Sequence, residues 1–182
     1  RQMCIRDSIQ GADEAAKELG ITDEVELEYV CGGQFYGDAD ITAYMDTWYG
    51  SKGVEVVFAC GGGIYTSAAE AAAKVDGKVI GVDSDQSVVA PDTILTSAMK
   101  RVDNACYDEA KEILEGGFTQ GVQTFTLADG GVDIAPTTDN IDPEVLKKVD
   151  EVKEKIISGE IEVPTDKESF DAKYGDVYQL DD

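Results

Sequence analysis

The chain has 182 residues, enough for one well-buried hydrophobic core, so we expect one main domain. Its 15 basic and 38 acidic residues give a formal net charge of −23, which makes nucleic acid and anionic membrane surfaces poor partners. The acidic surface is most simply a solubility feature. No stretch approaches the roughly 20 apolar residues of a membrane span, and residues 1–11 lack the apolar run of a secretion signal.

The residue types also argue against a zinc site and against a histidine-assisted nucleophile. The chain has no histidine, and its four cysteines form no CxxC pair. A zinc site and a Cys-His nucleophile are therefore not expected. We expect the thiols to be free and buried: Cys4, Cys31, Cys60 and Cys106.

The chain opens with a segment that differs from the rest. Residues 1–8, RQMCIRDS, resemble translated sequencing-adapter DNA and stay unassigned as a candidate artefact. Apolar residues at helical spacing then predict a helix over residues 9–19, which Gly20 ends. Alternating apolar and acidic residues predict an edge strand over residues 25–30.

A glycine-rich loop follows at residues 31–40, CGGQFYGDAD. Either Asp38 or Asp40 can cap the helix that comes after it. Apolar residues at helical spacing carry that helix through Tyr49.

The centre of the chain, VVFACGGGIYTSAAEAAAKVDGKVIGVDSDQ, predicts a β-α-β unit. A strand over residues 54–60 runs into Gly61-Gly62-Gly63, and an alanine-rich helix covers residues 65–74. A second strand over residues 78–82 ends in the acidic turn 83–86, DSDQ. Ligands of open α/β sheets bind outside the carboxyl ends of the strands, so we expect the site at these two turns.

The pattern continues with a strand over residues 94–99 and an amphipathic helix over residues 102–114. Further strands are predicted over residues 122–127 and, more briefly, 132–135. On the helix we expect five residues to face inward: Ala105, Cys106, Ala110, Ile113 and Leu114.

The last predicted helix begins at Pro143 after an Asp142 cap and runs to about Ser158. Its apolar stripe has to pack on another surface. In the acidic tail beyond it, three aromatic rings can anchor the chain to a surface: Phe170, Tyr174 and Tyr178. The alternation of strands and helices predicts an α/β fold, a Rossmann-like parallel sheet with helices on both faces.

Glycines and carboxylates at the predicted edge suit ligand binding. Gly61, Gly62 and Gly63 let backbone approach a ligand closely, although a tight turn explains one of them equally well. Asp83 and Asp85 can accept hydrogen bonds from paired hydroxyls or bind a metal. Their alternative role is turn bonding or helix capping within the protein.

A cation and two aromatic rings are expected at the same edge. Lys100 ends the strand ILTSAMK, where it can bond a ligand hydroxyl and offset the charge of Asp83, or serve as a surface cation. Phe35 and Tyr36 can stack on a planar ring, with packing against Trp48 as the ordinary alternative. We assign no catalytic residue, because no nucleophile has an evident base, and we expect a binding protein without a cofactor.

Several stretches together resemble the basic membrane protein family, the substrate-binding lipoproteins of nucleoside ABC transporters. They are VFACGGGIYTSAAEAA, GVDSDQ, ILTSAMKRVDNACYDEA, GGVDIAP and PEVLKKVDEVKEKIISGEIEVP. The resemblance implies one lobe of a type I periplasmic-binding-protein fold. It divides the chain into unassigned residues 1–8, a carboxyl-terminal ligand-binding lobe over 9–135, and a return helix with an acidic tail over 136–182.

The resemblance also implies roles for site residues. Asp83 and Lys100 resemble the family's ligands of the ribose hydroxyls, Gly62 lies against the sugar, and Phe35 or Tyr36 stacks on the base. The missing amino-terminal lobe would supply the opposing wall, the lipid anchor and the base-reading groups. The implied function is extracytoplasmic capture of a purine nucleoside for delivery to a permease.

Two other functions stay open at this point. The fold also hosts binding proteins for sugars and signalling molecules. A Rossmann-like enzyme with a nucleotide cofactor is a further alternative, although the glycine turn matches neither GxGxxG nor a P-loop.

Overall fold

The computed structural model describes residues 2–164 and 166–175, which divide into two compact units. The larger unit is Phe35–Glu160, and the smaller joins the residues up to Gln34 with those from Ile161 onward. Within the described residues, no helix is long and apolar enough to cross a membrane.

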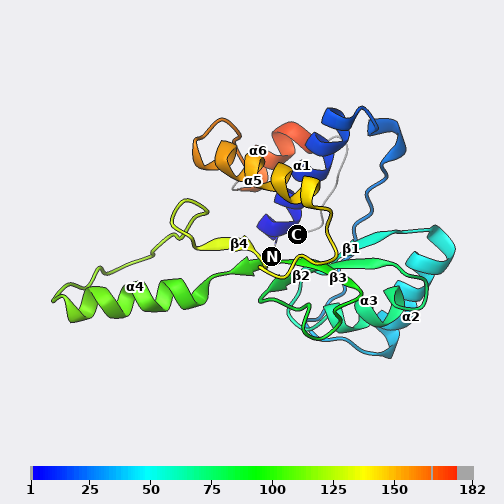
Figure 1. Ribbon diagram of the computed structural model, residues 1–182, viewed down its shortest axis with the longest axis horizontal. Helices are drawn as coiled ribbons and strands as arrows, with labels where there is room; N and C mark the ends of the chain where they lie inside the picture. The colour runs from blue at the N-terminus through cyan, green and yellow to red at the C-terminus, as the bar shows by residue number, and fades with distance from the viewer. Residues whose placement is uncertain (1, 165, 176–182) are drawn as a thin grey trace. The chain divides into compact units, whose positions relative to one another are not determined.

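The larger unit is built on a four-stranded sheet in the order β1-β2-β3-β4 (Figure 1). Its strands are β1 (Val56–Phe58), β2 (Lys78–Asp83), β3 (Ile94–Lys100) and β4 (Val132–Ile134). The first three are parallel, as predicted. β4 runs antiparallel to β3, because the chain returns beside the end of β3, where the Arg101 N–H donates to the Gly131 carbonyl at 2.9 Å.

Two helices cover one side of this sheet. Helix α2 (Ala39–Thr47) is capped by Asp38, whose carboxylate accepts from the Ile41 N–H at 2.9 Å, so of the two predicted caps Asp38 fills the role. A short π-helical turn, Trp48–Lys52, follows it. Helix α3 (Tyr65–Ala72) presents small alanines inward, which lets it lie close to the strands.

The core of the larger unit lies between these helices and the strands. The Tyr49 hydroxyl donates to the Lys78 carbonyl at 2.8 Å, and burial raises the pKa of Tyr49. A Cβ on Gly77 would lie 2.6 Å from the Tyr49 ring, so only glycine fits there. The buried members are Met45, Trp48, Tyr49, Val57, Ala59, Ala68, Ala69, Ala71, Ala72, Val79 and Ile94.

Helix α4 (Val102–Leu114) does not pack as predicted. It buries none of its residues, and Ile113 and Leu114 are 56% and 88% exposed. Figure 1 shows α4 extending away from the sheet. The expected inward face, Ala105, Cys106, Ala110, Ile113 and Leu114, is therefore a wrong prediction for this structure, because no other element covers that face within the described part of the chain.

The strand predicted over residues 122–127 is also absent from the described structure. Residues 122–126 have no regular secondary structure, and Val122 is 96% exposed. A segment with strand-forming residues becomes a strand only where another strand pairs with it, and this segment has no such neighbour in the described sheet.

Helix α5 (Pro143–Ile157) follows the prediction closely. The Asp142 side chain accepts from the Glu144 N–H at 2.8 Å, and Pro143 occupies the first turn. None of its residues is buried, so its apolar stripe is only partly covered. An ion pair of 2.9 Å between Lys153 and Asp133 joins α5 to β4.

Removing the α5 cap is expected to loosen that helix. Asp142→Ala should reduce the stability of α5 by about 1 kcal/mol, because the Glu144 N–H loses its acceptor. Amide hydrogen exchange over α5 should therefore accelerate roughly fivefold. Asp139→Ala, at an exposed position outside the helix, is the control. Equal exchange in both variants would contradict the capping role.

The smaller unit pairs helix α1 (Gln2–Leu19) with helix α6 (Lys167–Tyr174), and a short 3-10 turn, Thr22–Glu24, follows α1. Ile9, Phe170 and Tyr174 form its core. Lys173 pairs with Glu14 at 2.9 Å.

This unit confirms some predictions and corrects others. Phe170 and Tyr174 anchor the tail as predicted, whereas Tyr178 lies outside the described residues. The helix predicted over residues 9–19 is confirmed, but it is longer than predicted because α1 begins at Gln2. The strand predicted over residues 25–30 is wrong: this segment is irregular and pairs with no strand in the described sheet.

The expectation of buried thiols is also wrong. Cys31 and Cys106 are exposed, and Cys60 is partly buried. Cys31 lies in the irregular segment and Cys106 on the uncovered α4, so the elements that were expected to bury them do not do so. The side chain of Cys4 lies outside the described part of the structure.

Candidate functional site

Three chain segments with polar or glycine residues meet at the carboxyl edge of the parallel strands. Gly61–Gly63 follow β1, Asp83 ends β2, and Lys100 ends β3. In the β2–β3 register, Asp83 lies beside Met99, one residue before Lys100. The parallel arrangement thus brings together residues that are up to 39 positions apart in the sequence (100 − 61).

Asp83 and Lys100 form an ion pair, with 2.8 Å between Oδ1 and Nζ. Both side chains are about half exposed, at 44% and 56%. An exposed pair of this kind stabilises a fold by only about 0–1 kcal/mol. Asp83 also has a left-handed backbone with φ of 68°, which non-glycine residues adopt rarely and which concentrates at functional sites.

The glycine turn lies against the aromatic segment. The Gly63 N–H donates to the Phe35 carbonyl at 2.7 Å, and Tyr36 and Gly63 form an isolated parallel bridge. Gly62 has φ of 55°, and a Cβ there would lie 3.1 Å from the Phe35 oxygen. Phe35 and Tyr36 are each 63% exposed, while Trp48 is buried beside Tyr44. The turn therefore carries two accessible rings.

Asp85 is bonded within the protein. Its Oδ1 accepts from the Ser87 hydroxyl at 2.6 Å and from the Ser87 N–H at 3.1 Å. Its Oδ2 accepts from the Thr137 hydroxyl at 2.6 Å. The Ser87 hydroxyl and, next, the Thr137 hydroxyl lower the pKa of Asp85. These contacts match the turn-bonding role that the sequence left open.

The Asp85 contacts predict a pH-dependent contribution to stability. Because the folded state lowers the pKa of Asp85, the stabilisation is present above the unfolded pKa, about 4, and is lost as the pH falls through the folded value. In urea unfolding, wild type should therefore have a larger free energy of unfolding than Asp85→Asn at pH 6. This difference should disappear below about pH 4. Asp92→Asn is the exposed control. A gap that stays constant with pH would contradict the assignment.

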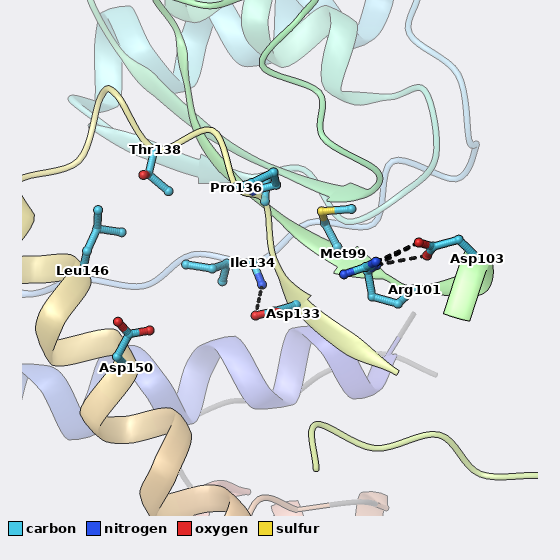
Figure 2. Close-up of a pocket in the computed structure, with 10 residues that line it drawn as sticks. Met99, Arg101, Asp103, Asp133, Ile134, Pro136, Thr138, Leu146 and Asp150 are labelled. Carbon is cyan, nitrogen blue, oxygen red and sulfur yellow. Dashed lines mark hydrogen bonds and ion pairs between the residues drawn. The ribbon is translucent and has the colours of Figure 1, made fainter. Parts of the chain in front are cut away.

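A hollow of about 520 Å³ lies beside this edge, between β3, β4 and α5. Figure 2 shows Leu146 and Asp150 of α5 together with Ile134 and Asp133 of β4 around it. Successive strand residues point to opposite faces, so Met99 lines this hollow while Lys100 reaches Asp83. The hollow is therefore distinct from the residues that the sequence selected.

The described residues offer no obvious metal centre. Among the side chains that the structure describes, no three acidic or cysteine side chains are grouped closely enough to hold a metal ion. At the sheet edge, the chemical groups are a carboxylate, an ammonium, glycine backbone and aromatic rings. This combination can bind a polar ligand that carries a planar ring.

Sequence reasoning placed Gln86 in the acidic turn 83–86 but gave it no role, whereas in the structure its side chain lies between the two turns. Its side chain is 6% exposed and contacts both Val82 and Gly62. The available signal was its position at the end of GVDSDQ, directly after the two carboxylates.

Comparison with known proteins identifies the family. The model of a family described as "ABC transporter substrate-binding protein PnrA-like" matches residues 7–167. The chain belongs to this family. Basic membrane protein D of Borreliella burgdorferi is 33% identical over 167 residues, covering 88% of the chain and 48% of the relative. A CD4+ T-cell-stimulating antigen of Listeria monocytogenes is 39% identical over 131 residues, covering 63% and 37%.

Two solved structures share the fold of this family member. An ABC transporter solute-binding protein from Aeropyrum pernix is similar with a TM-score of 0.65 and 26% identity, covering 89% of the chain and 54% of that protein. A transcriptional activator of the comK gene from Bacillus halodurans gives 0.62 and 26%, covering 71% and 45%. The predicted periplasmic-binding-protein fold is confirmed. The chain spans less than half the length of these two curated relatives.

Proposed function

We propose that the chain is the carboxyl-terminal lobe of an extracytoplasmic solute-binding protein that captures a purine nucleoside and delivers it unchanged to an ABC transporter permease. The observation that carries this proposal is the Asp83–Lys100 pair, which lies at the sheet edge with the glycine turn. Family membership supports the solute-binding role.

The chemistry of these residues suits a ribonucleoside. A carboxylate accepts hydrogen bonds from two neighbouring hydroxyls, as in the 2′ and 3′ positions of ribose. The Lys100 ammonium offsets the negative charge and can donate to a sugar oxygen. Gly62 lets the sugar approach the backbone, and an exposed ring at Phe35 or Tyr36 can stack on a purine.

Binding without reaction fits the same set of groups. A reaction would need a nucleophile with a base in hydrogen-bond reach, or an acid and a base placed across a substrate bond. Of the described carboxylates at this edge, Asp83 is paired with Lys100, and Asp85 bonds Ser87 and Thr137. Neither arrangement resembles a catalytic pair.

The proposal includes partners that this chain does not supply. One wall of a cleft leaves most of a ligand in water, so an amino-terminal lobe of the same protein would form the second wall. The protein would act outside the cytoplasm, anchored by lipid at the cell surface or in the periplasm. The other partner is the permease, and nucleic acid is not a partner.

Calorimetric titration of the protein with both lobes tests this function. Inosine, guanosine and adenosine are the ligands, and at least one should bind with micromolar affinity or better, whereas the chain alone should bind weakly. Free ribose and other sugars form the comparison series. Absence of heat with every nucleoside would overturn the proposal, and heat with a sugar alone would establish a sugar-binding protein instead.

A further inference from the structure

Strands β1 and β2 separate before β2 ends. They pair only from Val56 with Lys78 to Phe58 with Ile80, and the Ala59 N–H then donates to the Ile80 carbonyl at 3.0 Å. In a parallel sheet, residues two apart along a strand direct their N–H groups to the same side. Ile80 bonds toward β1, so the N–H of Val82, two residues later, also points to the β1 side. At that level, however, the segment after β1 has already turned away into the glycines.

The Gln86 side chain occupies this opening. Its Oε1 accepts from the Val82 N–H at 3.2 Å, and its Nε2 donates to the Gly62 carbonyl at 3.4 Å. A carboxamide offers one acceptor and one donor group, like the peptide unit of a neighbouring strand. Gln86 thus takes the place of the missing part of β1 and links the two turns.

Neighbouring residues hold the amide in position. The Gln86 N–H donates at 3.1 Å to the hydroxyl of Ser97, which is fully buried on β3. Gly81 leaves room for the amide, because a Cβ there would overlap Gln86 Oε1 and lie 2.6 Å from Ser97 Oγ. Side chain and backbone of Gln86 are therefore fixed from β2 and β3 together.

The linked groups flank the candidate ligand residues. Val82 directly precedes Asp83. Gly62 directly precedes Gly63, whose N–H donates a hydrogen bond to the Phe35 carbonyl. We propose that Gln86 is a positioning residue that sets the spacing between Asp83 and the glycine turn. Its meaning for ligand binding rests on the function proposed above.

Residue-resolved amide hydrogen exchange on the chain tests the positioning. In Gln86→Met, exchange at Val82 should accelerate at least ~10-fold, while Val79, which donates to Thr93 at 3.0 Å, should stay within about twofold. Gly81→Ala should reproduce this pattern, because it displaces the amide without altering Gln86. Gln120→Met, at an exposed position, is the control and should leave both residues unchanged. Equal acceleration at Val79 and Val82 would indicate general destabilisation and overturn the proposal.

A titration of the two-lobed protein with inosine separates this inference from the proposed function. Gln86→Met should weaken inosine binding at least ~10-fold, with Gln120→Met unchanged. If wild type does not bind inosine while exchange in Gln86→Met accelerates at Val82 but not at Val79, the nucleoside proposal fails and the positioning role stands. If wild type and Gln86→Met bind inosine equally, the positioning role is overturned.

Discussion

Asp83→Ala is expected to weaken nucleoside binding by the two-lobed protein severely. A hydrogen bond to a charged group contributes about 1.5–3 kcal/mol, so loss of the bonds to two ribose hydroxyls should lower affinity at least ~100-fold. The change also removes the ion pair between Asp83 and Lys100. Because the pair is half exposed, stability should change little, and the melting temperature should stay close to wild type. Calorimetry with inosine measures the affinity.

Asp76→Ala is a matched control for this prediction. Asp76 also has a positive φ, of 58°, and pairs with a lysine, Lys78, at 3.0 Å. It precedes β2 instead of ending it, so it lies away from the carboxyl edge. The control should bind inosine like wild type. If the two variants bound equally well, Asp83 would not contact the ligand.

A ligand analogue probes the same contact without mutation. If Asp83 accepts from the 2′-hydroxyl, 2′-deoxyinosine should bind to wild type more weakly than inosine does. Without that hydroxyl, the Asp83 carboxylate would lose a hydrogen-bond donor on ligand binding. In Asp83→Ala, the difference between the two ligands should disappear. A difference that persisted would place the hydroxyl against another residue.

The sequence predicted the β-α-β unit and its turns because local and tertiary signals agree there. The strands are continuous apolar runs, the alanines of α3 allow close packing, and polar turns follow each strand. Parallel strands place their carboxyl ends at one edge, so the meeting of Asp83 and Lys100 followed from topology alone.

The failed predictions concern elements whose stability depends on a neighbour. Residues 25–30 alternate as strands do and residues 122–127 were also predicted as a strand, yet neither segment has a strand beside it in the described sheet. The face of α4 has the spacing of a buried face, but nothing covers it in the described structure. Periodicity reports what a segment can bury, and the neighbours decide whether it does so.

The role of Gln86 was beyond sequence reasoning for a related reason. It depends on where β1 leaves β2, which is a matter of strand length and register. β1 spans three residues, whereas the apolar run predicted a strand over residues 54–60. The shorter strand creates the opening that the glutamine amide fills.

Ile94→Ala is expected to destabilise the larger unit strongly. Ile94 is 1% exposed and belongs to the core that also contains Val79 and Trp48. Truncation of a buried isoleucine leaves a cavity and costs about 2–5 kcal/mol. Trp48 is the single tryptophan of the chain and is buried in the same core, so its fluorescence in urea reports on this unit specifically.

Ile113→Ala removes the same atoms from α4, where the side chain is 56% exposed. That control should change the unfolding free energy by less than about 0.5 kcal/mol. Because both substitutions remove the same atoms, the difference between them reports chiefly on burial, with a smaller part from the different helix and strand propensities of alanine. Similar losses in the two variants would mean that Ile113 packs against the core in solution. The α4 face would then be covered. A loss of unfolding free energy confined to Ile94→Ala instead supports a core built from the sheet with α2 and α3.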